Sequence, residues 1–190
     1  MDKMSKGSKR AAFLLNVNAK SVTKKLLTKL SALIPKDDLY LSKNLLDAER
    51  NIRAIMDKGY AYVFCGGGDG TVVSAINLLK SYAKEHPHAR VLPIGILGLG
   101  TGNALARFLH AQNPEEDIKA ILSGKPIKQK MVSMIESDSG QLTPFAGIGY
   151  DGELMNDFES VKQVFFDSPF RKPMSSVFGF AVAGFLRTLP

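Results

Sequence analysis

The chain has 190 residues, 45% of them hydrophobic, with a single cysteine and a net charge of +7. This length suffices for one domain with a sizeable core, or for one domain and part of another. One cysteine excludes an internal disulfide, and no apolar stretch near the N-terminus is typical of a secretion signal, so we expect a protein of the reducing cytoplasm.

The excess of positive charge gathers in the first part of the chain, where only Asp2 opposes Lys3, Lys6, Lys9, Arg10, Lys20, Lys24 and Lys25. Such a cluster favours an anionic partner, and attraction to acidic lipid headgroups is worth about 1 kcal/mol per basic residue near a membrane. A solvated basic tail over residues 1–10 is the alternative. No aromatic-basic pattern of an RNA-binding sheet accompanies the charge, so we do not expect a nucleic-acid partner.

From residue 11 to residue 126 the chain alternates between predicted strands and predicted helices. Hydrophobic patterning predicts strands at 11–17, 38–41, 60–64 and 91–97 and helices at 21–34, 44–58, 72–84, 104–109 and 115–122. Alternation at this spacing predicts right-handed crossovers. The expected fold is therefore α/β, with a Rossmann-like parallel sheet and helices on both of its faces.

After residue 126 the pattern changes, and we expect a second domain over residues 127–190. Residues 128–135 and 142–149 are predicted to be paired strands, joined by a turn at 137–140. The apolar segment 174–186 is predicted to form a helix, which falls short of the ~20 apolar residues that a membrane-spanning helix needs. If more chain is required to cover it, its exposed apolar surface predicts oligomerisation.

Two glycine-rich turns each follow a predicted strand and open a predicted helix. The first is Cys-Gly-Gly-Gly-Asp-Gly-Thr at 65–71, and the second is Gly-Leu-Gly-Thr-Gly-Asn at 98–103. Glycine lets the main chain approach a ligand closely, and the start of a helix offers unpaired N–H groups and the positive end of its dipole. Loops that follow adjacent parallel strands lie at the same edge, so we expect Asp69, Thr71, Thr101 and Asn103 in one crevice. Each glycine also has a structural alternative, since a tight turn needs the same residues.

The paired turns resemble the catalytic domain of the diacylglycerol kinase and sphingosine kinase superfamily. Gly-Gly-Asp-Gly alone also occurs in NAD kinases and phosphofructokinases, whereas Gly-Thr-Gly-Asn running into Ala-Leu-Ala-Arg, at 100–107, is characteristic of the lipid kinases. The resemblance extends more loosely from Ala11 to about Leu189, through a segment at 147–151 similar to the start of the family's second domain. It implies an NAD kinase/phosphofructokinase-like fold and a mostly β second domain. That domain would be longer than the remaining chain, so we expect a fragment or a truncated member.

The resemblance implies transfer of the γ-phosphate of ATP, with Mg²⁺, to the hydroxyl of a diacylglycerol-like or sphingoid lipid. We expect an enzyme peripheral to the membrane, with Asp69 as the catalytic residue. Asp69 is either the base that receives the hydroxyl proton or the group that orients Mg²⁺ through water; a helix cap is the structural alternative. The expected nucleotide-binding residues are Asn16, Ser42, Gly66, Gly67, Gly68, Gly70, Thr71, Gly100, Thr101, Gly102 and Asn103. Asn103 either contacts the nucleotide or caps the helix that follows it, and Asp151 and Glu153 are expected to bind the lipid headgroup.

The chain departs from the family pattern at two places near the expected nucleotide. Residues 16–20 lack the proline and glycine of the family's Asn-Pro-x-Ser-Gly, and Val73 and Ser74 stand where the family usually carries Asn-Glu. Ser42 keeps the hydroxyl of the threonine that the family often has. Two rival functions therefore remain: a nucleotide- or lipid-binding module without turnover, and an NAD kinase-like enzyme.

Overall fold

The computed structural model describes residues 10–111, 113–147, 149–165, 168–169 and 177–185. The chain divides into two compact units, Met1–Leu142 and Thr143–Pro190.

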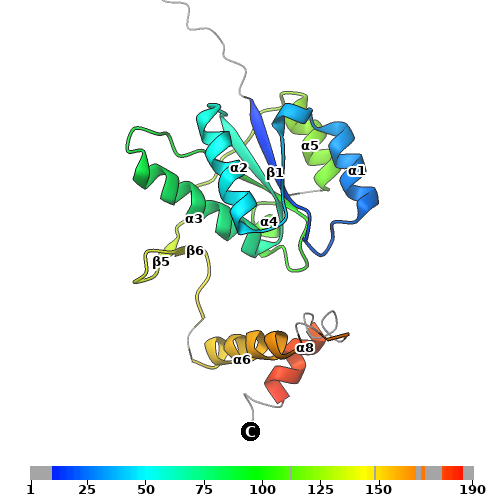
Figure 1. Cartoon of the computed structure of the whole chain (residues 1–190), viewed down its shortest axis with the longest axis vertical. Helices are drawn as coiled ribbons and strands as arrows, with labels where there is room; N and C mark the ends of the chain where they lie inside the picture. Colours follow the sequence, from blue (N-terminus) through cyan, green and yellow to red (C-terminus); the bar gives the residue numbers. More distant parts are fainter. Residues whose placement is uncertain (1–9, 112, 148, 166–167, 170–176, 186–190) are drawn as a thin grey trace, which may run out of the picture. The chain divides into compact units, whose positions relative to one another are not determined.

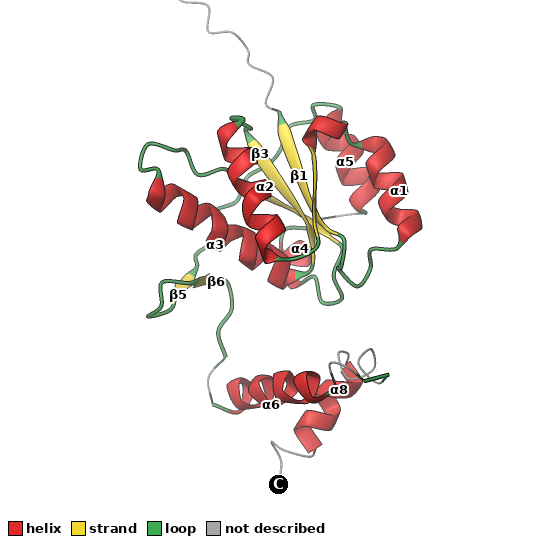
Figure 2. Cartoon of the chain, in the orientation of Figure 1, coloured by secondary structure: helices red, strands yellow, loops and turns green. Residues whose placement is uncertain are grey.

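The first unit is built on a sheet of four parallel strands in the order β2-β1-β3-β4 (Figure 2). The strands are β1 (Ala11–Asn16), β2 (Leu39–Ser42), β3 (Tyr62–Gly67) and β4 (Ile94–Gly98). Pairing of Asn16 with Ser42 and of Gly67 with Gly98 brings the carboxyl ends of the strands to one edge. The predicted parallel α/β fold is confirmed.

Helices cover both faces of this sheet, with α2 (Leu45–Asp57) and α3 (Asp69–Glu85) on one face and α1 (Lys24–Leu33) and α5 (Pro114–Leu122) on the other (Figure 1). The short α4 (Ala104–Phe108) follows β4, and a 3-10 helix spans Lys36–Asp38. Successive side chains of a strand point to opposite faces, so β1 contributes to two cores. Ala12 and Leu14 pack in the core that includes Ile55 of α2, whereas Phe13 and Leu15 pack in the core that includes Leu30 of α1.

Side chains at the helix starts explain several boundaries. Thr23 accepts the N–H of Leu26 at 3.1 Å, so α1 begins at Lys24 rather than at residue 21 as expected. Asn44 accepts the N–H of Asp47 at 2.8 Å and starts α2. Such caps satisfy N–H groups that the first turn of a helix leaves unpaired.

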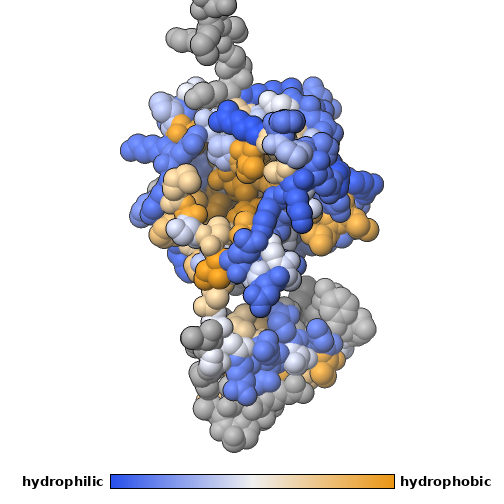
Figure 3. Space-filling model, turned by 90° about the vertical axis from the view of Figure 1, so that its left-hand side faces the viewer, coloured by the Kyte–Doolittle hydropathy of each residue, from blue (hydrophilic) through white to orange (hydrophobic). Residues whose placement is uncertain are grey.

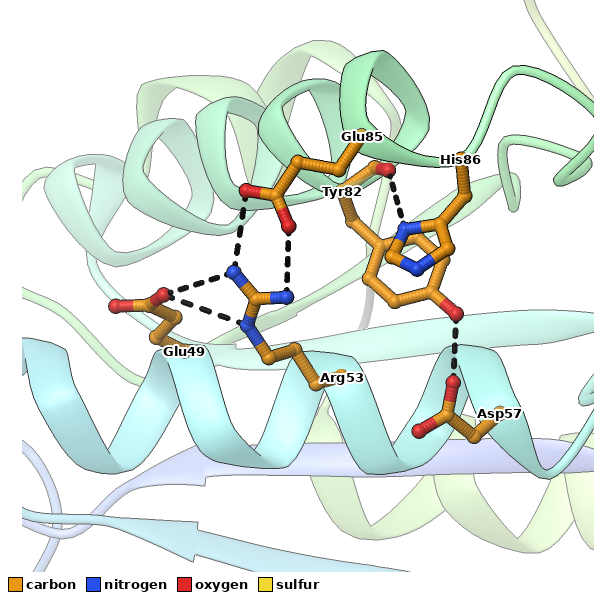
Figure 4. A network of polar contacts seen from close by, with 6 residues as sticks. All are labelled: Glu49, Arg53, Asp57, Tyr82, Glu85 and His86. Carbon is orange, nitrogen blue, oxygen red and sulfur yellow. Dashed lines mark hydrogen bonds and ion pairs between the residues drawn. The ribbon is translucent and has the colours of Figure 1, made fainter.

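A polar network joins α2 to α3 on the surface (Figure 4). Arg53 of α2 donates two hydrogen bonds to Glu85 of α3, at 2.8 and 3.2 Å, and also contacts Glu49. The hydroxyl of Tyr82 in α3 donates to Asp57 of α2 at 2.6 Å. The ring of His86 stacks on the ring of Tyr82. The network ties the far end of α3 to α2.

The predicted turn at 137–140 is present, but its strands are short. β5 (Ile135–Glu136) pairs with β6 (Leu142–Thr143), and the N–H of Ser137 donates to the carbonyl of Gln141 at 2.9 Å. Asn77 of α3 holds this hairpin through two hydrogen bonds of 2.8 Å with the backbone of Leu142. Residues 128–134 do not form the expected strand, because none of the strands in the described part of the chain pairs with them.

The second unit differs from the β-rich domain expected over residues 127–190. Its described residues after Thr143 contain no strand and form α6 (Tyr150–Val164) and α8 (Val177–Ala183). The rings of Phe158 and Phe180 meet edge to face at 5.4 Å, which packs the two helices together. The division at Leu142 also falls later than the expected boundary, because the hairpin is held by α3.

α8 lies within the apolar segment predicted to be helical, of which residues 174–176 and 186 lie outside the described ones. No helix among the described residues is long and apolar enough to cross a bilayer. Large apolar side chains are nonetheless exposed in both units, and Figure 3 shows an apolar area hollowed into the surface of the first unit.

Candidate functional site

The two glycine-rich turns lie against each other at the carboxyl edge of the sheet. A Cβ atom built on Gly100 would stand 2.2 Å from the Cα of Gly68 and 2.9 Å from its nitrogen. The N–H of Leu99 donates to the carbonyl of Gly67 at 3.1 Å. The adjacency of β3 and β4 therefore brings the turns together as predicted, and at Gly100 the glycine is required by contact with the other turn.

The carboxylate of Asp69 bridges the turns. Asp69 is the first residue of α3, and its Oδ2 and Oδ1 accept the N–H groups of Ala104 and Leu105 at 3.0 and 2.9 Å. The residue before α4, Asn103, makes no side-chain capping bond. Asp69 thus caps α4 across the site, whereas its own helix begins after Gly68 without a side-chain cap.

Asn103 does not cap α4 with its side chain, and its backbone adopts the left-handed conformation with φ +50°. Its side chain folds back on Gly100, accepting that residue's N–H at 2.8 Å and donating to its carbonyl at 2.9 Å. Asn tolerates this conformation better than most residues because its short side chain bonds locally. The amide closes the second turn and leaves the cap of α4 to Asp69.

Ser21 is a further part of the site that sequence reasoning missed. Its hydroxyl donates to the carbonyl of Gly100 at 3.1 Å, and its N–H donates to the carbonyl of Leu99 at 3.3 Å. These contacts tie the segment after β1 to the second turn. No local pattern signals them, because the partners are 79 positions apart.

Asn16, at the end of β1, positions the hydroxyl of Thr71. Its Nδ2 donates to Thr71 Oγ1 at 3.0 Å, while its Oδ1 accepts the N–H of Asn18 at 2.9 Å. Because Asn16 supplies the donor, the hydroxyl proton of Thr71 is left for another acceptor. Two of the candidate residues therefore act as a pair, and a phosphate oxygen is an acceptor of suitable chemistry.

The glycines of the first turn have different roles. A Cβ on Gly66 would stand 2.4 Å from Leu15 Cδ2, and one on Gly67 would stand 2.5 Å from Thr71 Oγ1. Packing within the protein therefore requires these two glycines. A Cβ on Gly70 would meet no atom within 4 Å, and one on Gly102 would lie 3.3 Å from Asp69 Oδ2. Gly70 is thus the glycine of the first turn at which a side chain would face open space.

Backbone donors at the start of α3 suit an anion. The N–H groups of Thr71 and Val72 both donate to the carbonyl of Gly68, at 3.0 and 3.2 Å. The preceding N–H groups, of Asp69 and Gly70, have no acceptor within the helix. Together with the helix dipole they form a phosphate-binding arrangement, whereas the corresponding groups of α4 are already bound by Asp69. The residues present therefore fit the phosphates of a nucleotide.

A magnesium ion would need ligands beyond the protein. The described residues contain no group of three histidines, cysteines or carboxylates able to hold a metal ion. Mg²⁺ is commonly bound through one or two carboxylates, substrate phosphates and water. Asp69 has oxygen lone pairs left after its two hydrogen bonds and fits that limited role.

One expected ligand residue of the first unit, Ser42, does not reach the turns. The side chain of Ser42 is buried, and its hydroxyl donates to the carbonyl of Leu15 at 3.4 Å rather than reaching the turns. Asp151 and Glu153 belong to α6 of the second unit; Glu153 is exposed, and the side chain of Asp151 lies outside the described ones. Thr101 is exposed in the second turn, beside Gly102.

The cysteine next to the first turn is part of the core. Cys65 is fully enclosed among the side chains between the sheet and α3, and burial raises the pKa of its thiol to about 12. The thiol therefore stays protonated near neutral pH, which excludes a nucleophilic role there.

Residues 10–134 match the family model of the diacylglycerol kinase catalytic domain, which covers more than half of the sequence. The chain belongs to this family. Two solved structures of a candidate diacylglycerol kinase from Bacillus anthracis str. Sterne are similar, with TM-scores of 0.52 and with 24% and 25% sequence identity. Each match covers 70% of this chain and 47% of the other, so the chain spans about half the length of these relatives. A comparison with curated proteins returns no match.

Both turns and the Asp69 bridge lie within the matched residues, as does the 125–132 segment that follows α5. The B. anthracis structure with 24% identity supports the fold of the first unit, a parallel sheet flanked by helices. α6 and α8 lie beyond the matched range.

Proposed function

We propose that this chain carries the nucleotide-binding site of an ATP- and Mg²⁺-dependent lipid kinase, which phosphorylates the hydroxyl of a diacylglycerol-like or sphingoid lipid. The observation that supports this most strongly is the Asp69 bridge, which holds two glycine turns together beside the open N–H groups of α3. Membership of the diacylglycerol kinase catalytic domain family favours phosphoryl transfer over other uses of such a site.

Bound ATP would supply the phosphoryl group, and the chain would supply position and charge. Phosphoryl transfer passes through a loose transition state, so fixed donors around the phosphates contribute more than covalent assistance. The N–H groups of Asp69 and Gly70 and the hydroxyl of Thr71, held by Asn16, are such donors. The lipid oxygen would bond to the γ-phosphorus while the bond to the β,γ-bridging oxygen breaks, and the hydroxyl proton would pass to a base.

Asp69 is the proposed base or Mg²⁺-orienting group. Two N–H bonds occupy one lone pair on each carboxylate oxygen, so each oxygen keeps another for a substrate proton or a metal-bound water. The same bonds fix the carboxylate against rotation.

The rival reading is a binding module without turnover. The two bonds from Asp69 to α4 give this residue a complete structural role that needs no catalysis. Val73 and Ser74, in place of the family's Asn-Glu, also remove a carboxylate from the nucleotide side.

The test is transfer of radiolabelled γ-phosphate from ATP to mixed-micelle diacylglycerol, sphingosine, ceramide and monoacylglycerol, with NAD as an additional acceptor. The Asp69→Asn variant is compared with Asp138→Asn, which alters an exposed carboxylate of the hairpin turn. Transfer to one lipid that is lost in Asp69→Asn and kept in Asp138→Asn would support the kinase. Binding of an ATP analogue with no transfer to any acceptor would favour the module, and phosphorylation of NAD alone would contradict the lipid kinase.

A further inference from the structure

Residues 125–131 and the edge strand β4 line a common cavity of about 890 Å³. The lining is largely apolar, and it includes Phe108 at the end of α4 and Ile127. Met131 in the same segment has 96% of its surface exposed, the largest fraction among the exposed large apolar residues of the described chain. Exposed apolar side chains grouped in this way indicate an interaction surface.

Three lysines surround this apolar area. Lys125, Lys128 and Lys130 are exposed and line the same cavity, whose acidic lining residue is Asp117. None of the three forms an ion pair with a described residue, in contrast to Lys29 and Lys80, which pair with Glu115 and Glu136. The surface therefore combines exposed apolar groups with positive charge that no ion pair among the described residues neutralises.

Lys130 and Phe108 connect the two properties. The Lys130 ammonium lies 3.8 Å from the centroid of the Phe108 ring, and 47% of that phenylalanine is exposed. A cation over an aromatic face is favourable, and in this position the charge stands at the border of an apolar group. Such an arrangement matches the bilayer interface, where anionic headgroups overlie acyl chains.

We infer that this surface docks the protein on an anionic lipid bilayer, with Met131 and Phe108 entering the acyl boundary and Lys125, Lys128 and Lys130 contacting acidic headgroups. Charge complementarity selects this partner. The basic residues at the start of the chain, expected from the sequence to contact a membrane, are a different set of lysines, so substituting them is a separate test.

The surface is connected to the candidate site through α4. This helix begins at the N–H groups bound by Asp69 and ends at Phe108, a length of about 7 Å at 1.5 Å per residue. Docking would therefore hold the phosphate-binding turns close to the bilayer. This benefit rests on the proposed lipid kinase function, but vesicle binding does not, so the two fail independently.

The test is co-sedimentation of the full chain with phosphatidylcholine vesicles, with and without added phosphatidylserine. Wild type is compared with the combined substitution Lys125→Glu, Lys128→Glu and Lys130→Glu and with the single Met131→Asp. A matched control reverses Lys3, Lys6 and Lys9 in the N-terminal cluster. Thermal unfolding of each variant is measured to check that it keeps the fold.

We expect binding that requires phosphatidylserine and weakens by at least about 100-fold in the triple substitution at 125, 128 and 130, because each lysine near the surface contributes about fivefold. Met131→Asp should also weaken binding, and the N-terminal control should retain most of it. Unchanged binding by the triple substitution, or loss confined to the N-terminal control, would overturn the inference. The inference would also be overturned if the wild-type chain bound no vesicles but formed a dimer that Met131→Asp dissociates. A second copy of the chain would then occupy this surface.

Discussion

Gly68 and Gly100 touch across the two glycine-rich turns, so closely that a Cβ on Gly100 would stand 2.2 Å from the Cα of Gly68. The neighbouring atom belongs to the backbone and cannot rotate away. This contact fixes the distance between the starts of α3 and α4. The spacing in turn allows the Asp69 carboxylate to reach α4.

Gly100→Ala should therefore destabilise the first unit. Forcing a methyl group into a filled site typically costs about 1–3 kcal/mol, and here it would also stand 2.9 Å from Asn103 Oδ1. Urea unfolding should show a reduced free energy of unfolding in this range. An unchanged midpoint would mean that the turns are not held in contact in solution.

Gly70→Ala provides the matched comparison, since a Cβ there meets no protein atom within 4 Å. Alanine restricts the unfolded chain and suits a helix, so stability should be equal or slightly higher. If phosphates bind at the start of α3, the added methyl group should weaken ATP-analogue binding measured by calorimetry. Full affinity in this variant would argue against that location.

Asp69→Ala should lower the stability of α4 by removing its cap. Replacing a capping side chain by alanine costs roughly 1 kcal/mol, and both the Ala104 and Leu105 N–H groups lose their partner. Hydrogen exchange should show faster exchange at these two amides than in wild type. Unaltered protection of both amides would refute the bridge.

Much of this site follows from short stretches of sequence, and some of it does not. Hydrophobic runs before 65–71 and 98–103 indicated two strands, and parallel order then required their turns to share an edge. The partners of Asp69 are 35 and 36 positions away, and no local pattern encodes a contact of that span. Of the two alternatives for Asn103, the helix cap is not formed, because its left-handed backbone is accompanied by a side chain that bonds to Gly100 instead.

The second half of the chain was less predictable for a different reason. The apolar residues in 128–135 and 142–149 suit a strand, but a strand also needs a neighbour with which to pair. In the described residues the pairing is limited to Ile135–Glu136 with Leu142–Thr143. Local patterning therefore overestimated strand there.

The thiol of Cys65 should be unreactive in the folded protein. Burial raises its pKa to about 12, so the thiolate is scarce at pH 8 and is also shielded. Alkylation by iodoacetamide, followed by mass spectrometry, should be negligible under native conditions and complete in guanidinium chloride. Rapid native labelling would contradict the burial of this residue.

The network between α2 and α3 should make stability depend on acidic pH. Hydrogen bonds from Arg53 lower the pKa of Glu85 below its ordinary value of 4.5. Because the folded-state pKa is the lower one, the stabilisation is fully present above pH 4.5 and is lost as the pH falls through the folded-state value. Glu85→Gln should therefore lower the melting temperature at pH 7.

The difference between Glu85→Gln and wild type should shrink once the carboxyl is protonated in both states. Glu49→Gln is the comparison, since Glu49 also contacts Arg53 but at 3.3 and 3.4 Å rather than 2.8 and 3.2 Å. It should have the smaller effect in scanning fluorimetry across the pH series. A difference for Glu85→Gln that stays constant down to acid pH would show that the charge is not responsible.

The most direct test of the proposed site is an amide NMR titration of the chain with ATP and Mg²⁺. A nucleotide site at these turns predicts saturable shifts of the Asp69, Gly70 and Thr71 amides at the start of α3, with smaller changes at Ala104 and Leu105, whose N–H groups are already bound. Shifts confined to other parts of the chain, or none at saturating nucleotide, would contradict a nucleotide site at these turns.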